Sequence, residues 1–167
     1  MKEIKVIIDG KEVRLTDEQL RALGITKENN NPFDRVKGEY YTIKDDGVVY
    51  DYTDIQDRYD NTLYNNVNYF NDNAFAQQVH LHQLLYRKLL KFAYDNNYFD
   101  TASWNGIVSH WYIGYDYESK QYIGCSDYTV AEANTVYFNS RNAVNSAIEQ
   151  VVRPFEAKNP DFKWKGF

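Results

Sequence analysis

The chain has little of several things that would define its class. Its 167 residues include a single cysteine, Cys125, so no disulfide can form within it and a reducing, cytoplasmic setting is expected. No apolar run approaches the roughly 18 residues that a membrane span needs. The apolar run near the N-terminus is short and is broken by Asp9 and Gly10, which is not the pattern of a secretory signal. We therefore expect no membrane segment.

Positive charge is also in short supply. The chain has 19 lysines and arginines against 24 aspartates and glutamates, a net charge of −5. Residues 39–64 contain seven acidic and two basic residues. The difference of five equals the net charge of the whole chain, so acidic and basic residues are equal in number in the rest of it. Nucleic-acid binding depends on Lys and Arg side chains that neutralise phosphates. The composition argues against direct nucleic-acid binding.

The motifs of common reaction types are missing. The sequence has no glycine-rich phosphate loop, no G-x-S-x-G and no H-E-x-x-H. His80 and His82 are two residues apart on a predicted helix, so they point to different faces and do not share a metal ion. We predict no metal and no cofactor. His110 and Cys125 could form a base and a nucleophile if the fold brings them together, and a small hydrolase built on them stays an alternative.

Tyrosine and aspartate are what the sequence has in abundance. The chain holds 16 tyrosines, and the stretch VVYDYTDIQDRYDNTLYNN, residues 48–66, combines them with evenly spaced acids. The candidate partner-binding residues in it are Tyr50, Asp51, Tyr52, Asp54, Asp57, Tyr59, Asp60 and Tyr64. Such a row could bind a metal, imitate a phosphate backbone or be solvated connecting chain. Its period of three and lack of glycine do not fit an EF-hand loop.

The N-terminal segment, residues 1–25, is predicted to be a β-hairpin followed by a short helix. Residues 3–8 and 11–15 alternate as strands do, and Asp9-Gly10 between them is a two-residue hairpin signal. Residues 16–19 fit a capping box, and Gly24 is a helix stop. Residues 26–37 are interpreted as a linker.

The rest of the chain is predicted to contain two similar units, residues 38–98 and 108–167, joined by residues 99–107. Both have a strand, a turn, a strand and then a Tyr-Phe-Asn sequence, at residues 69–71 and 137–139, that leads into a helix. The class is α+β, with two repeated ββ(β)α units of antiparallel strands.

The helices of the two units are predicted from their apolar periodicity. The first runs from about residue 73 to 94, with its apolar face on Phe75, Val79, His82, Tyr86, Leu89 and Ala93. The second begins after Ser140 as N-cap and reaches about residue 157, with Pro154 expected to kink or end it. The aromatic tail, with Phe162, Trp164 and Phe167, is expected to dock on the domain.

Several segments together resemble a known family. They are NPFDRVKGEYYTIKDDGVV, DNTLYNNVNYF, WYIGYDY and YFNSRNAVNSAIEQVV. The chain resembles small accessory proteins of phages and prophages of low-GC Gram-positive bacteria, whose shared motifs are structural. The resemblance implies the cytoplasm of a bacterial host and a role in host takeover or defence evasion. It implies no catalytic residue.

These observations favour a non-catalytic, phage-encoded binding protein. We expect it to inhibit a host nucleic-acid-targeting defence complex, as anti-CRISPR proteins do, through the acidic, tyrosine-rich residues 50–64. Tyrosines would supply buried area, and aspartates would pair with Arg or Lys of a host defence protein or ribonucleoprotein. Two alternatives remain, a homo-oligomeric structural or scaffold protein and the hydrolase using His110 and Cys125.

Overall fold

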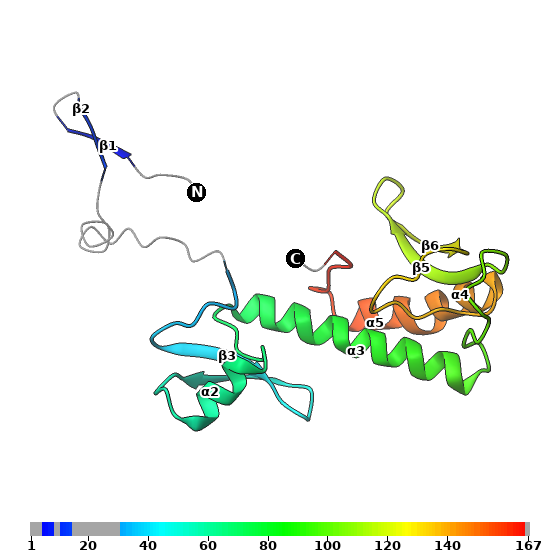
Figure 1. Ribbon diagram of the computed structural model, residues 1–167, viewed down its shortest axis with the longest axis horizontal. Helices are drawn as coiled ribbons and strands as arrows, with labels where there is room; N and C mark the ends of the chain where they lie inside the picture. Colours follow the sequence, from blue (N-terminus) through cyan, green and yellow to red (C-terminus); the bar gives the residue numbers. More distant parts are fainter. Residues whose placement is uncertain (1–4, 9–10, 15–30, 166–167) are drawn as a thin grey trace.

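The computed structural model describes residues 5–8, 11–14 and 31–165, which form an α+β protein (Figure 1). Its elements are β1 (Lys5–Ile8), β2 (Lys11–Arg14), β3 (Glu39–Ile43), β4 (Val49–Thr53), α2 (Arg58–Asn65), α3 (Asn73–Asp95), β5 (His110–Asp116), β6 (Gln121–Asp127), α4 (Arg141–Ala147), the π-helical turn η1 (Ile148–Val152) and α5 (Arg153–Lys158). Within these residues the strands form three two-stranded sheets, β1–β2, β3–β4 and β5–β6, all antiparallel. No helix in the described part is long and apolar enough to cross a membrane.

The N-terminal strands β1 and β2 pair with Val6 opposite Val13. The predicted turn at Asp9 and Gly10 and the predicted helix of residues 16–24 lie outside the described residues.

The β3–β4 hairpin turns at the Asp45-Asp46-Gly47 sequence. Gly47 has φ +74°, a conformation that residues with a side chain rarely adopt, and its amide donates to the carbonyl of Lys44 over 2.8 Å. A Cβ on Gly47 would also lie 3.2 Å from the His80 ring. Beside β3, Phe70 pairs with Tyr41 through two backbone hydrogen bonds of 2.7 and 2.9 Å.

The β5–β6 hairpin is longer and packs closely on α4. Gly124 lies opposite Ile113, and a Cβ on it would come within 3.3 Å of Val144 on α4. Beside β5, Phe138 pairs with Trp111 through backbone hydrogen bonds of 3.2 and 2.7 Å. Glycine at position 124 therefore lets the helix approach the sheet.

The long helix α3 runs beside both hairpins. In Figure 1, β3–β4 and α2 lie at its N-terminal end, and β5–β6, α4 and α5 lie along the remainder. Its predicted extent, residues 73–94, is confirmed to within one residue, and Asp72 is its N-cap. Its predicted apolar face is partly wrong, because Tyr86 keeps 37% of its surface exposed. The buried positions are Ala76, His80, Leu85, Leu89 and Ala93, so the prediction is confirmed for Leu89 and Ala93 and missed Ala76 and His80.

The second helix begins after its N-cap Ser140, as predicted, but Pro154 does not end it. Helical structure continues through η1 and α5 to Lys158. In η1 the amide of Arg153 donates to the carbonyl of Ile148, five residues earlier. The widened turn has therefore already shifted the hydrogen-bond register before Pro154, which has no amide hydrogen to donate.

The apolar core gathers around α4, η1, β5 and the C-terminal half of α3. Its members include Leu85, Leu89, Ile113, Phe138, Val144, Ile148, Val152 and Phe155. The tail covers one side of it, because Phe162 is 6% exposed and packs edge-on against Phe155. Docking of the tail is thus confirmed for Phe162 and for the half-buried Trp164, while Phe167 lies outside the described residues.

Candidate partner-binding surface

The predicted row of acids and tyrosines does not form one extended segment. Residues 50–53 belong to β4, residues 54–57 form a turn, and residues 58–65 form α2. Successive side chains of a strand point to opposite faces, so Asp51 lies on the other face of β4 from Tyr50 and Tyr52. The structure therefore divides the eight candidate residues among several environments.

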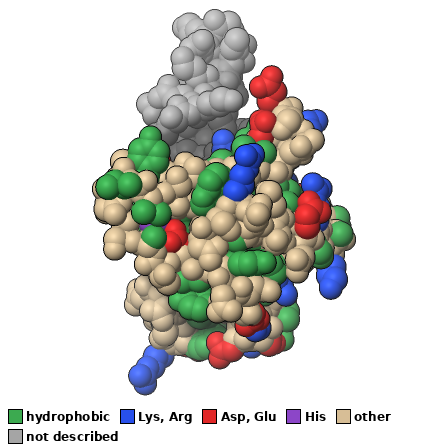
Figure 2. Space-filling view, turned by 90° about the vertical axis from the view of Figure 1, so that its right-hand side faces the viewer, with side chains coloured by type: hydrophobic (Ala, Val, Ile, Leu, Met, Phe, Trp, Pro, Cys, Tyr) green, Lys and Arg blue, Asp and Glu red, His purple; other side chains and the backbone are tan. Residues whose placement is uncertain are grey.

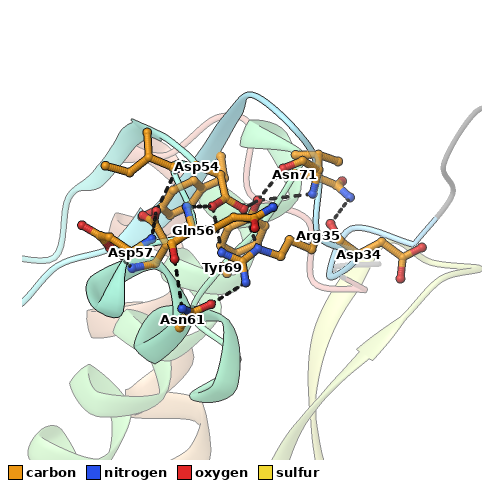
Figure 3. Close-up of polar contacts among 12 residues, drawn as sticks. Asp34, Arg35, Asp54, Gln56, Asp57, Asn61, Tyr69 and Asn71 are labelled. Carbon is orange, nitrogen blue, oxygen red and sulfur yellow. Dashed lines mark hydrogen bonds and ion pairs between the residues drawn. The ribbon is translucent and has the colours of Figure 1, made fainter.

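Asp54 is engaged within the chain. Its side chain is 2% exposed and receives two hydrogen bonds from the Arg35 guanidinium, from Nε over 2.6 Å and from Nη2 over 2.8 Å. The Tyr69 hydroxyl donates to the same carboxylate over 3.1 Å, and Arg35 also reaches Asn61 over 2.6 Å (Figure 3). The hydrogen bond from Arg35 holds the pKa of Asp54 well below its usual range. This carboxylate is not available to a partner.

Asp57 and Asp60 start helix α2. The Asp57 carboxylate accepts from the amide of Asp60 over 2.9 Å, and the Asp60 carboxylate accepts from the amide of Asp57 over 3.3 Å, which is a capping box. Asp60 is 4% exposed and also accepts from the Tyr40 hydroxyl over 2.7 Å and from the amide of Ile55 over 2.9 Å. Asp60 thus has a structural role in the interior.

Three of the tyrosines remain on the surface. Tyr50, Tyr59 and Tyr64 are 36%, 46% and 39% exposed, while Tyr52 is half-buried. The Lys44 ammonium lies over the rings of both Tyr50 and Tyr52, at 4.4 and 4.9 Å from their centroids. Tyr52 also contacts Tyr59, with centroids 5.8 Å apart. Lys44, Tyr50, Tyr52 and Tyr59 are therefore contiguous, and we call them the tyrosine surface.

The remaining two candidates lie apart from the tyrosine surface. Asp51 is exposed on β4 opposite Tyr41. Within the described residues it is the one aspartate of the row whose side chain makes no hydrogen bond and caps no helix. Tyr64 contacts the buried Tyr69 edge-on and lies under the Arg35 guanidinium, 5.5 Å from its ring centroid. The surface that the structure assembles is therefore aromatic, with a lysine at its centre, more than it is acidic.

His110 and Cys125 share a face of the β5–β6 hairpin without meeting. His110 pairs with Asp127 and Cys125 with Tyr112, so the two are diagonal neighbours in the ladder. The Cys125 sulfur lies against Gly114, 2.7 Å from where a Cβ would be, on the far side of Tyr112 from His110. His110 Nε2 has no hydrogen-bond partner among the described residues. Among the described residues, no hydrogen bond joins the two side chains.

The hydrogen-bond partner of His110 was not predicted from the sequence. Its Nδ1 lies 2.6 Å from Oδ2 of Asp100, and both side chains are buried, with 1% and 4% exposed. The Trp104 ring stacks on the imidazole, with centroids 3.7 Å apart and an interplanar angle of 12°. Asp100 and Trp104 come from the segment that the sequence predicts only as a connection, which is why this pair was not expected.

Comparisons with known proteins complete this description. Among the described residues, no three His, Cys, Asp or Glu side chains come together as a metal site would require. No family model matches the chain, and neither the curated proteins nor the solved structures contain a significant match to it.

Proposed function

We propose that this chain is a non-catalytic protein-binding protein that contacts its partner through the tyrosine surface. The observation that carries the proposal is the contiguous set of Tyr50, Tyr52 and Tyr59, two of them more than one third exposed on a hairpin and an adjoining helix. Tyrosine offers a rigid apolar ring and a polar tip, and it is enriched in the buried centres of protein interfaces.

The specific form of this proposal is inhibition of a host nucleic-acid-targeting defence complex, such as a CRISPR effector, in the cytoplasm of a bacterial host. It is supported by the resemblance to phage accessory proteins and by the chain's negative charge, which suits a basic partner. In this form Asp51, exposed on the other face of β4, would contribute to the long-range attraction of a basic partner.

The experiment combines identification of the partner with a matched kinetic comparison. The full chain is used to capture proteins from bacterial lysate, and the purified candidate is then bound to wild type, Tyr59→Ala and Tyr117→Ala. Tyr117, 56% exposed on the β5–β6 turn, is the control. We expect Tyr59→Ala to raise the dissociation rate by about tenfold. Equal rates for both variants would contradict the proposed surface.

The inhibitor form is tested separately, by adding the purified chain to a reconstituted CRISPR effector and measuring target cleavage. We expect wild type to reduce cleavage and Tyr59→Ala to reduce it less. Sedimentation over a concentration series tests the scaffold alternative, because self-association through the tyrosine surface would be lost in the same variant. Full cleavage of the target at a saturating concentration of the chain would contradict the inhibitor form. It would not contradict the general proposal of protein binding through the tyrosine surface.

We also propose that residues 31–95 and 96–165 are two copies of one ββα unit. The support is a repeated set of contacts. Asn71 donates from its backbone amide to the carbonyl of Pro32 and from its side chain to the carbonyl of Asn31, over 2.9 and 3.0 Å. Asn139 makes the corresponding contacts with the carbonyls of Tyr98 and Asn97, both over 2.9 Å.

The neighbouring contacts repeat as well. The residue before each asparagine, Phe70 or Phe138, pairs with the first strand of its hairpin, and the residue after it, Asp72 or Ser140, caps the following helix. We expect Asn71→Ala and Asn139→Ala to destabilise the chain by similar amounts, about 1 kcal/mol each in denaturant unfolding. A large effect of one and none of the other would count against a common unit. The N-terminal hairpin and helix of residues 1–25 would then be an addition to this pair.

A further inference from the structure

A cavity of about 400 Å³ lies between the C-terminal half of α3 and the segment that leads into β5. Its lining comes from α3, from residues 99–104, from β5 and from the chain before α4, and consists of Tyr86, Leu90, Tyr94, Phe99, Asp100, Ala102, Trp104, His110, Thr135 and Tyr137. Five of these ten residues are Phe, Trp or Tyr. The cavity belongs neither to the tyrosine surface nor to the apolar core.

The buried polar side chains of the lining are the paired Asp100 and His110. A carboxylate accepts hydrogen bonds, so His110 Nδ1 donates to Asp100, and in that neutral tautomer Nε2 is an acceptor. That nitrogen is buried and has no partner among the described residues. A buried acceptor without a donor is costly, and it is satisfied when a ligand supplies an N–H group.

The charge of the lining is negative. Asp100 is its one acidic residue, and no Lys or Arg side chain contributes to it. The Asp100 carboxylate therefore places a negative charge beside the five aromatic rings of the lining. A low-dielectric environment strengthens the attraction of such a charge for a cation.

The aromatic walls favour the same kind of ligand. Two of them are ring stacks, Trp104 on His110 and Tyr94 on Phe99, the latter with centroids 4.4 Å apart. Tyr86, Tyr94 and Trp104 keep 37%, 60% and 40% of their surface exposed, so their rings are accessible from outside. Figure 2 views this end of the molecule, where hydrophobic side chains are spread over the face and most charged ones lie toward its edge. Aromatic faces attract cations.

We infer that this cavity receives an arginine side chain of the partner protein. The guanidinium is planar, stacks on aromatic rings, and offers several N–H donors, one of which fits the unpaired imidazole nitrogen. The Asp100 carboxylate, which already accepts from His110 and from the amide of Ala102, adds charge attraction without a direct contact. A lysine ammonium shares the charge but not the planar stacking, so arginine is the better match. The inference rests on the proposed function, because it assigns the arginine to the bound protein, and it adds a second contact region on the opposite half of the chain.

The test uses a small probe and the full chain. Nα-acetylarginine amide is titrated into the protein while the indole N–H signals of the three tryptophans are followed by NMR, with Trp104 assigned through Trp104→Phe. A ligand of this size is expected to bind with a Kd of about 1 mM. We expect a saturable shift of the Trp104 signal, and a response at least about tenfold weaker from the citrulline analogue, which has the same shape without the charge. Equal responses to both probes, or no saturation at roughly thirty times the expected Kd, would overturn the inference.

Two variants locate the binding. Asp100→Asn keeps the shape of the side chain and removes its charge, and we expect it to weaken arginine binding by about tenfold. Tyr94→Ala removes an exposed wall and should have a similar effect. Tyr117→Ala is the matched control, because Tyr117 is 56% exposed and, like Tyr94, stands in contact with one other ring. If Tyr94→Ala and Asp100→Asn both bind the arginine probe with wild-type affinity, the site is refuted. It is also refuted if the control Tyr117→Ala loses as much affinity as these two variants do.

The outcome is independent of the partner search. The probe titration needs no partner, so its failure removes the arginine site and leaves the tyrosine surface to be judged by its own kinetics. Conversely, a chain that captures no protein would contradict the proposed function while the arginine titration still reports on the cavity.

Discussion

The two halves of the described body, residues 31–95 and 96–165, bury different kinds of side chain. In residues 31–95 the interior of the hairpin is aromatic and polar, with Tyr40 stacked on Tyr69 at 4.2 Å and hydrogen-bonded to the buried Asp60. In residues 96–165 the sheet packs on an aliphatic core around Val144 and Val152, both fully buried. The first half therefore depends more on the geometry of hydrogen bonds, and the second more on apolar area and close packing.

Each half also pairs a buried ring with a buried carboxylate. Tyr40 donates to Asp60 in the first, and His110 donates to Asp100 in the second. Asp60 accepts the hydrogen bond of the Tyr40 hydroxyl and also takes part in the capping box of α2. That pair therefore stabilises the start of a helix. The imidazole of His110 has a second nitrogen that the fold does not satisfy. Among the described residues, the two pairs therefore differ in that only His110 keeps a ring atom without a hydrogen-bond partner.

The largest effect is expected from Phe138→Ala. Phe138 is completely buried in the apolar core, and we expect the variant to lower the free energy of unfolding by about 4 kcal/mol. The matched change is Phe70→Ala, whose ring contacts Phe33 and Phe75. Because Phe33 is 37% exposed, this cluster lies closer to solvent, and we expect a smaller loss of unfolding free energy. Denaturant unfolding followed by circular dichroism measures both. Equal losses would show that the two halves are not packed differently.

A smaller effect is expected from Asp60→Ala. The variant removes the acceptor for the Tyr40 hydroxyl and for the amides of Ile55 and Asp57, and we expect a loss of about 3 kcal/mol. Asp51→Ala, an exposed acid nine residues earlier in the same row, is the control and should stay within about 0.5 kcal/mol of wild type. Thermal unfolding of both variants checks this, and comparable losses would contradict the division of the row.

Asp54→Asn should have a pH-dependent effect. The pKa of Asp54 is lower in the folded protein because of the hydrogen bond from Arg35. Such a carboxyl stabilises the fold above its unfolded pKa of about 3.9, and this contribution is lost as the pH falls below that value. We expect the variant to lose about 1–3 kcal/mol at pH 7 and the difference from wild type to shrink below about pH 4. Denaturant unfolding at pH 7, 5 and 3 measures it, and a difference that grows toward low pH would give the opposite sign.

The smallest expected effect is that of Tyr40→Phe. Removing the hydroxyl leaves one oxygen of Asp60 without its donor, and we expect a loss of about 1 kcal/mol. The neighbouring Tyr41→Phe is the control, because the Tyr41 hydroxyl donates to the exposed Glu39 and should contribute about 0.5 kcal/mol or less. Chemical unfolding with both proteins under identical conditions makes the comparison. Equal losses would mean that burial does not decide the value of these hydrogen bonds.

The class and the long helix could be predicted because their signals are local. Alternation gave the strands, and the start of the second helix followed from the capping preference of Ser140. Helix α2 was missed because its capping box uses Asp57 and Asp60, and a row of aspartates has the composition of a solvated loop. Their spacing of three was the available signal, since that is the spacing between an N-cap and the third helical residue.

The parts that could not be predicted depend on contacts between distant residues. Asp54 meets Arg35, which is 19 positions away in a segment that the sequence suggested was linker. The pairing of His110 with Asp100 requires residues 99–107 to fold back on β5, and no sequence periodicity predicts that contact. The face of α3 was predicted correctly at Leu89 and Ala93 and wrongly at Tyr86, because one periodicity was fitted to a helix that packs against two different surfaces.

That double duty of α3 has a consequence for how such a chain can evolve. By its place in the sequence the helix belongs to the first half, yet Leu85, Leu89 and Ala93 near its C-terminal end are members of the core formed by the second. A recombination event after residue 95 would separate the second half from α3, and its apolar core would then lack Leu85, Leu89 and Ala93. The two halves can have arisen by copying, but they can no longer be exchanged or inherited separately.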